Sequence, residues 1–192
     1  MGNSLVNMRD QKFVLYEQFG IDGLFGTKAF PDYSREVVDL MLSEAEKMAV
    51  EILLPGRKEG DKGCTFKDGN VSAPPVFHEM YKKFIEGGWM IAMREPEVGG
   101  QGMPVAVSTA CYELFNAANF PFIMYPGLTN GAAALIQHYG TERQKKLYMD
   151  KMYAGEWGGT MCLTEPGAGT DVGALKTTAR RLPDGTYSIT GT

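Results

Sequence analysis

The sequence contains few of the residues from which metal sites and disulfide frameworks are built. It has three cysteines and two histidines among 192 residues. Cys64, Cys111 and Cys162 lie far apart, with neither CxxC spacing nor a neighbouring histidine pair. Neither a disulfide framework nor a zinc site is therefore expected. Unpaired cysteines suit a reducing compartment, so we expect a cytoplasmic protein without a bound metal.

Charge and hydropathy argue against two classes of partner. The formal charge is −4, and the lysines and arginines are spread along the chain. No basic surface is therefore predicted for nucleic acid or for an anionic membrane. No apolar run is long enough to span a bilayer. A hydrophobic share of 44% and a charged share of 22% are typical of a globular domain.

The common cofactor and nucleophile motifs are also missing from the sequence. There is no G-x-G-x-x-G after a predicted strand, no phosphate-binding G-x-x-x-x-G-K-[ST] and no G-x-S-x-G. His78 and His138 each fall inside a predicted helix among polar neighbours, so we expect them at the surface rather than in catalysis.

Helical periodicity dominates the first part of the chain. Residues 1–31 are weakly patterned and are interpreted as an extension of the main body. Predicted helices cover 32–54, 76–86, 104–118, 126–139 and 141–154, the last beginning at a capping box of Thr141 and Gln144 and ending near Gly155. A polar, glycine-rich excursion with a small hairpin is predicted at 56–73, where Asp68-Gly69 indicates a tight turn. The stripe expected to face the core in the first of these helices is Val37, Met41, Ala45, Met48 and Ile52, and in the fourth it is Leu128, Ala132, Leu135 and Ile136.

The hydrophobic period changes from helical to alternating after residue 158. Strands are predicted at 159–164, 174–181 and 186–191, the last two joined by a turn at 183–185. The order predicts an α+β fold in which an α-helical bundle precedes the first strands of a β-domain. Because a lone hairpin is marginally stable and the pattern stops in mid-strand, we expect a truncated sheet.

A proline- and glycine-rich corner follows the first predicted strand. Pro166, Gly167 and Gly169 end that strand and leave backbone amides uncovered beside the hydroxyl of Thr164. A flat heterocycle with carbonyl and ring-nitrogen acceptors could use such donors. Glycine spacing alone favours the simpler interpretation, a strand that ends in a glycine-rich loop. For Glu165 we expect a structural role, with its carboxylate accepting N–H groups of the loop.

Three blocks of sequence together resemble the acyl-CoA dehydrogenase family. The stretch GGTMCLTEPGAGTDVGALKTTA at 158–179, followed by DGTYSITGT at 184–192, is similar to the flavoprotein signature of that family. Upstream, EPEVGGQG at 95–102 and GTERQKK at 140–146 match two further blocks in the same order. The resemblance covers residues 32–192 and is strongest to the long, 3-methylmercaptopropionyl-CoA dehydrogenase-like branch.

The resemblance implies a domain organisation and a set of binding residues. Residues 32–157 would form the N-terminal helical domain, and 158–192 the start of the middle β-domain of a truncated acyl-CoA dehydrogenase fold. The residues that would face the flavin of FAD are Met161, Cys162, Leu163 and Thr164. Gly169 and Thr170 would meet the CoA arm of the substrate. Thr170 stands where serine is more usual, and Met161 where an aromatic residue is frequent.

The implied reaction is the α,β-desaturation of an acyl-CoA thioester. A glutamate base removes the α-proton, the β-carbon passes hydride to the flavin, and an electron-transferring flavoprotein reoxidises the flavin. In the family that glutamate comes from a C-terminal helical bundle, so no catalytic residue is expected within these 192 residues. We expect a homo-oligomer when the protein is full-length, and neither turnover nor tight FAD binding by this chain alone. An acyl-CoA oxidase on the same scaffold and a non-catalytic interaction module are the alternatives.

Overall fold

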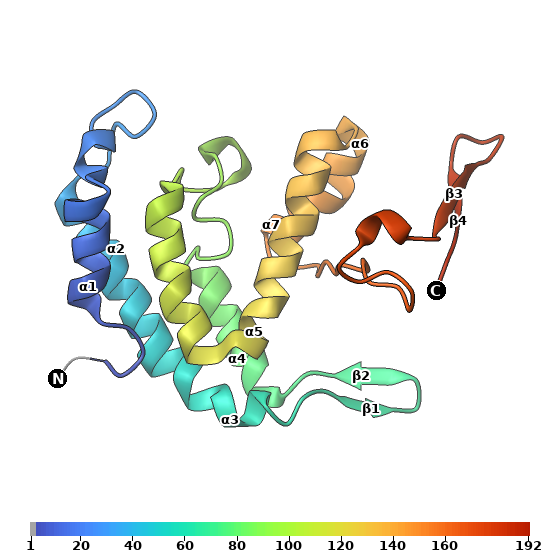
Figure 1. The fold of residues 1–192 in the computed structure, drawn as a ribbon, viewed down its shortest axis with the longest axis horizontal. Helices are drawn as coiled ribbons and strands as arrows, with labels where there is room; N and C mark the ends of the chain where they lie inside the picture. Colours follow the sequence, from blue (N-terminus) through green and yellow to red (C-terminus); the bar gives the residue numbers. More distant parts are fainter. Residues whose placement is uncertain (1–2) are drawn as a thin grey trace. The chain divides into compact units, whose positions relative to one another are not determined.

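The computed structural model describes residues 3–192, which form two compact units. The first unit ends at Gly159 and is helical, with one small hairpin; the second, Thr160–Thr192, contains turns and a hairpin (Figure 1). The α+β order expected from the sequence is thus confirmed. No helix in residues 3–192 combines the length and the hydropathy needed to cross a membrane.

The chain enters the first unit through a short helix that packs on a much longer one. Helix α1 (Met8–Lys12) continues as a π-helix over Phe13–Gln18, and a 3-10 turn follows at Ile21–Leu24. The long helix is α5 (Val105–Tyr139). The Gln11 side chain, which is only 7% exposed, joins the two helices because its amide donates to the carbonyl of Ala110 at 2.9 Å.

Helix α2 (Arg35–Lys47) confirms the first predicted long helix. Ser34 caps its N-terminus, and it continues as a π-helix over Met48–Leu53. The buried stripe of this helix differs by one residue from the predicted one. A second apolar stripe runs beside the predicted stripe, and it lies at the centre of the contact with α5. The buried residues are Val38, Leu42, Ala45, Ala49 and Leu53, whereas Val37, Met41, Met48 and Ile52 are half-buried at its border.

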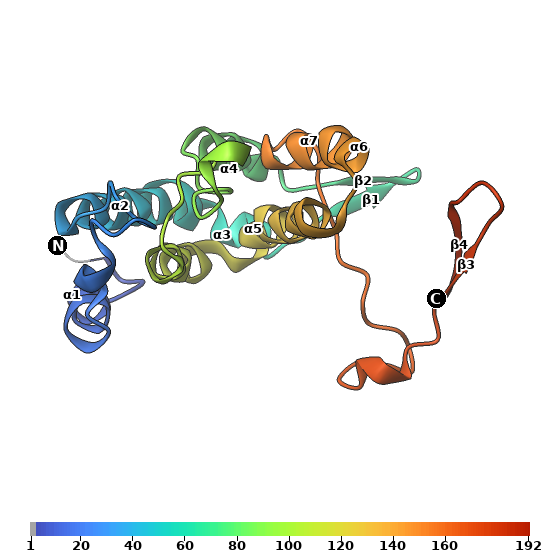
Figure 2. The same ribbon diagram turned by 90° about the horizontal axis from the view of Figure 1, so that it is seen from above.

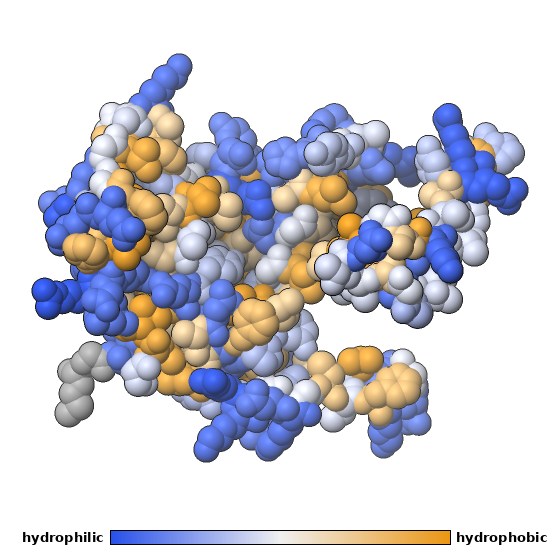
Figure 3. All heavy atoms as spheres, in the orientation of Figure 1, coloured by the Kyte–Doolittle hydropathy of each residue, from blue (hydrophilic) through white to orange (hydrophobic). Residues whose placement is uncertain are grey.

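A two-stranded hairpin follows the short helix α3 (Arg57–Gly60), as the sequence predicts. Strands β1 (Thr65–Lys67) and β2 (Asn70–Ser72) pair antiparallel, and every one of their residues is exposed. Asp68 and Gly69, both at positive φ, form the two-residue turn, as Asp-Gly pairs commonly do in hairpins. Figure 1 shows this hairpin extending away from the helices, and Figure 3 shows hydrophobic groups on it.

Helix α4 (Pro75–Glu86) brings the aromatic core of the first unit together. Pro75 occupies its first position, where the missing N–H costs no hydrogen bond, and Gly87 follows its end. The ring of Phe84, which is fully buried, meets the rings of Phe115 and Phe122 edge-on at 5.3 and 5.7 Å between centroids. The core therefore lies between α4 and α5, with α2 also against α5 (Figure 2).

Helix α5 is two helical segments joined at a kink. Asn119 has non-helical dihedrals (φ −156°, ψ 78°), and its side-chain oxygen accepts the amide of Phe122 as an N-cap does. The second segment therefore starts directly after Asn119, and the predicted gap between 118 and 126 is wrong. The predicted inward position of Leu135 is also wrong, since that side chain is 62% exposed.

The last helical part of the first unit begins at a capping box, as predicted. Helix α6 (Glu142–Gln144), a π-helix over Lys145–Met149 and α7 (Asp150–Tyr153) follow one another without a break. The hydroxyl of Thr141 accepts the amide of Gln144, and the Gln144 side chain accepts the amide of Thr141. Gly155 at positive φ ends this part, as expected.

The second unit contains one antiparallel hairpin. Strands β3 (Thr178–Arg181) and β4 (Tyr187–Thr190) pair, with Ala179 opposite Ile189. The predicted turn at 183–185 is confirmed, with Gly185 at φ +84°. The predicted strand over 174–181 starts only at Thr178, because Ala174 ends a 3-10 turn and the amides of Lys176 and Thr177 donate to the Glu165 carboxylate.

Candidate functional site

The stretch predicted to face a flavin is extended and exposed. Met161 is 66% exposed and Leu163 46% exposed, and Cys162 and Thr164 are also exposed. Residues 159–164 pair with no strand in the part of the chain that the structure describes, so the strand predicted there is wrong. A strand exists only with a hydrogen-bonded neighbour, and here β3 and β4 use each other.

A tight turn follows this stretch. The amide of Glu165 donates to the carbonyl of Ala168 at 3.0 Å, and the amide of Ala168 donates back to the carbonyl of Glu165 at 3.1 Å. Pro166 and Gly167 form the tip, and Ala168 is only 3% exposed. Gly169 and Thr170, the predicted substrate contacts, come directly after this turn and are exposed.

The carboxylate of Glu165 closes the loop that contains Gly169 and Thr170. It accepts the amides of Lys176 at 2.8 Å and Thr177 at 2.9 Å, and also the Thr177 hydroxyl. These bonds, led by the one from the hydroxyl, stabilise the charged form and hold the pKa of Glu165 below its usual value. The structural role expected for Glu165 is confirmed.

The stretch before the turn offers unused hydrogen-bond donors. Within residues 3–192, the backbone amides of Met161, Cys162, Leu163 and Thr164 donate to no protein acceptor. Two exposed apolar side chains, those of Met161 and Leu163, lie among these amides. A flat, largely apolar ring with acceptors on its edge matches such a surface, so the residues present are compatible with an isoalloxazine. The structure leaves the six predicted contact residues exposed.

The first unit holds the chain firmly just before this stretch. The hydroxyl of Thr129 accepts the amide of Gly159 at 3.0 Å and donates to the carbonyl of Tyr125 at 2.7 Å. Thr129 is 2% exposed. Sequence reasoning missed Thr129 because a threonine inside a helix carries no local sign of a partner thirty residues later.

The other chemistry-bearing side chains do not form a competing site. His78 and His138 are exposed on helices α4 and α5, as predicted. Across residues 3–192, no three of the His, Cys, Asp and Glu side chains gather in a way that suits a metal ion.

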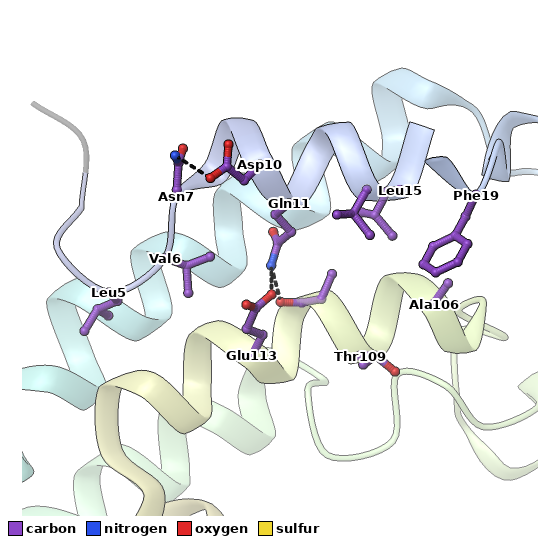
Figure 4. Close-up of a pocket in the computed structure, with 12 residues that line it drawn as sticks. Leu5, Val6, Asn7, Asp10, Gln11, Leu15, Phe19, Ala106, Thr109 and Glu113 are labelled. Atoms are coloured by element: carbon purple, nitrogen blue, oxygen red, sulfur yellow. Dashed lines mark hydrogen bonds between the residues drawn. The ribbon is translucent and has the colours of Figure 1, made fainter. Parts of the chain in front are cut away.

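A cleft of about 710 Å³ lies between the N-terminal helix and α5. Leu15 and Phe19 line it on one side and Ala106 and Thr109 on the other (Figure 4). Gln11, which also lines the cleft, is already bonded to α5 through the Ala110 carbonyl and the Glu113 carboxylate. The cleft contains none of the residues predicted to contact cofactor or substrate.

Comparisons with known proteins match the sequence to one family. The acyl-CoA dehydrogenase N-terminal domain matches residues 39–156. The chain is 38% identical over 152 residues to 3-methylmercaptopropionyl-CoA dehydrogenase of Ruegeria pomeroyi, which covers 79% of this chain and 26% of that protein. It is 37% identical over 188 residues to the broad-specificity linear acyl-CoA dehydrogenase FadE5 of Mycobacterium tuberculosis, which covers 96% of this chain and 30% of that protein.

Solved structures agree with the sequence matches. An acyl-CoA dehydrogenase of Bacillus anthracis complexed with FAD superposes with a TM-score of 0.65 at 28% identity, over 83% of this chain and 26% of that one. A structure from Acidaminococcus fermentans, described as an electron transferring flavoprotein, superposes with a TM-score of 0.64 at 26% identity, over 83% and 40% of the two chains.

The chain spans less than a third of the length of the two curated relatives described above. The match to the N-terminal domain nevertheless covers more than half of the chain and includes α4, α5 and the capping box at Thr141. This chain therefore belongs to the acyl-CoA dehydrogenase family.

Proposed function

We propose that this chain supplies the flavin-facing and CoA-facing segments of an FAD-dependent acyl-CoA dehydrogenase. The reaction is the α,β-desaturation of an acyl-CoA thioester, with an electron-transferring flavoprotein as the oxidising partner. Family membership and the dehydrogenase relatives support this proposal. The structural observation that carries it is the exposed stretch Thr160–Thr164, whose amides have no acceptor among residues 3–192.

The residues of this stretch have distinct tasks in the proposal. The amides of Leu163 and Thr164 and the Thr164 hydroxyl donate to acceptors on the ring, while the Met161 side chain keeps water from its face. FAD, when bound, supplies the two-electron acceptor for the desaturation. Because the amide donors belong to the backbone, their binding to the ring orders no additional side chain.

The loop after the turn takes the other ligand in this proposal. Gly169 brings the backbone close to the CoA arm, because it has no side chain, and the Thr170 hydroxyl hydrogen-bonds to it. Glu165 holds the loop closed through the amides of Lys176 and Thr177. We assign the proton-abstracting base to polypeptide outside residues 1–192, because the family resemblance places that glutamate in a C-terminal helical bundle and the carboxylate beside this stretch, Glu165, is already bonded to Lys176 and Thr177.

Titration of the purified chain with FAD, followed by quenching of flavin fluorescence, tests the proposal. We expect weak, saturable binding that Thr164→Val weakens about three- to tenfold, the loss typical of one hydrogen bond. Thr186→Val is the matched control, because the Thr186 hydroxyl bonds only the nearby Asp184 in the same unit. Absence of saturable binding, or equal weakening by both variants, would contradict the proposal.

Addition of an acyl-CoA to the loaded chain tests where the base lies. We expect no bleaching of the flavin absorbance by the chain alone. Bleaching that depends on acyl-CoA would place the base within these residues and would overturn that assignment.

A further inference from the structure

Thr129 uses its hydroxyl twice, and the second use is unusual for a helical threonine. The hydroxyl donates to the carbonyl of Tyr125, four residues earlier, which is the common local bond of a threonine in a helix. The same oxygen accepts the amide of Gly159, the last residue of the first unit. Because Thr129 is 2% exposed, water competes little for this bond.

Close packing against α5 also restrains the backbone at Gly159. A Cβ atom on Gly159 would lie 2.6 Å from the Cβ of Ala132 and 3.3 Å from the Cα of Thr129. The backbone at Gly159 therefore lies directly on the surface of α5, closer than any residue with a side chain allows. A hydrogen bond and a close contact thus hold one peptide in place.

The chain loses such restraints immediately afterwards. Residues 160–164 make no hydrogen bond within the part of the chain that the structure describes. An extended chain advances about 3.3 Å per residue, so Thr164 lies about 16 Å of chain beyond Gly159. The stretch is therefore restrained at its two ends, at Gly159 and at the turn between Glu165 and Ala168, and the bond at Gly159 fixes where the stretch begins. Binding sites tolerate displacements of only about 0.5 Å.

We infer that Thr129 is a positioning residue for the proposed flavin-facing stretch. Its hydroxyl sets the direction of the peptide at Gly159, from which Thr160–Thr164 begins. The inference rests on the proposed function, and Thr129 itself touches neither flavin nor substrate. Thr109 provides the comparison within the same helix, because its hydroxyl donates to the Val105 carbonyl at 2.8 Å but accepts no amide.

The test uses three variants of the full chain: Thr129→Val, Thr129→Ser and the control Thr109→Val. The hydrogen-exchange rate of the Gly159 amide, measured by NMR, reports the bond directly. The dissociation constant for FAD, from fluorescence quenching, reports its effect on the flavin-facing stretch. The midpoint of urea unfolding reports stability.

We expect Thr129→Val to speed Gly159 exchange and to weaken FAD binding about three- to tenfold. Thr129→Ser, which keeps the hydroxyl, should restore both values, and Thr109→Val should change neither. Because Thr129→Val leaves the Gly159 amide without its acceptor, its unfolding midpoint should fall below that of Thr109→Val, while the chain stays folded under the conditions of the binding assay.

The remaining outcomes separate the inference from the function on which it rests. If the unaltered chain binds FAD and Thr129→Val binds it equally well, the inference is wrong and the proposed function stands. If Thr129→Val weakens FAD binding while the Gly159 amide exchanges as slowly as in the unaltered chain, the loss of affinity has another cause and the inference is also wrong. If the unaltered chain shows no saturable FAD binding, the proposed function fails and the inference falls with it.

Discussion

The backbone amide of Thr177 donates to the carboxylate of Glu165 at 2.9 Å, across twelve residues of a glycine-rich loop. The bond favours the ionised carboxylate, which lowers the pKa of Glu165 in the folded chain. A lowered folded-state pKa means that the stabilisation is present above the unfolded-state pKa, about 4.3 for glutamate. The stabilisation is lost as the pH falls through the lower, folded-state value.

We therefore predict that the Lys176 and Thr177 amides are protected from hydrogen exchange at neutral pH and lose that protection in acid. Glu165→Gln should remove most of the protection at neutral pH and flatten its pH dependence. Asp184→Asn is the control, because Asp184 accepts from Thr186 in the hairpin turn and should affect that turn alone. Unchanged exchange in Glu165→Gln would show that the loop is closed by other means.

Asn119 is predicted to be the most sensitive polar residue of the first unit. Its side-chain amide donates to the carbonyl of Leu53 at 3.1 Å, and its oxygen accepts the amide of Phe122 at 3.2 Å. Asn119→Ala leaves both backbone groups without partners in the interior and removes a helix cap, so we expect a loss of about 2–4 kcal/mol in unfolding free energy.

Urea denaturation measures this loss, and Asn116→Ala on the exposed face of the same helix is the control. A change below about 0.5 kcal/mol in Asn119→Ala, the level of ordinary surface substitutions, would contradict the assignment.

The contact between Gly159 and Ala132 is predicted to couple the two positions. Gly159→Ala introduces a methyl 2.6 Å from the Cβ of Ala132 and should cost about 1–3 kcal/mol. Ala132→Gly alone should cost about 1 kcal/mol, as glycine does inside a helix. The double variant should be more stable than the sum of the two changes predicts, because the clashing Cβ is gone.

Gly158→Ala is the matched control for this cycle, since the nearest atom to its added Cβ is 4.0 Å away. Denaturation of the four variants measures the coupling. Strict additivity would mean that the chain around Gly159 moves freely enough to avoid the clash.

We predict that the pKa of Tyr125 depends on Cys64, which is distant in sequence but in contact with its hydroxyl. A hydrogen bond of 3.2 Å joins its hydroxyl to Cys64, and this bond, followed by burial, raises the pKa of Tyr125 to about 12. Cys64→Ala should lower that pKa toward the usual tyrosine value of about 10 without reaching it, because burial remains. The NMR shift of the Tyr125 ring follows the titration. Cys162→Ser, in the second unit, should leave it unchanged.

The sequence predicted best the features whose partners are close in the chain. The capping box at Thr141, the Asp68-Gly69 turn and the turn at 183–185 depend on residues at most a few positions apart, and all three are present. Their geometry follows from local backbone chemistry, which a short window of sequence contains.

The features that sequence reasoning missed depend on distant partners. The kink at Asn119 is held by Leu53, sixty-six residues earlier, so the local pattern could not show where the second segment of α5 begins. The core stripe of α2 was displaced because two adjacent apolar stripes compete, and the choice between them depends on what packs against α2. The segment 159–164 has the alternation of a strand, but no neighbouring strand pairs with it within residues 3–192.

The candidate site shows the same division. The glycines and the proline of the turn, and the role of Glu165 in its loop, follow from residue types. The hydrogen bond between Thr129 and Gly159 depends on how the chain up to Gly159 packs on α5. Neither residue type, taken alone, predicts that bond.

The exposure of the β1–β2 hairpin affects how freely its sequence can diverge during evolution. Phe66 and Val71 face each other on it, yet both remain more than two-thirds exposed, and the hairpin contributes nothing to the buried core. Its pairing is set by its own short ladder and by the Asp68-Gly69 turn. Substitutions there escape the packing constraints that govern Phe84 or Leu42, so this segment is free to diverge or lengthen between related proteins while the helices around it stay the same.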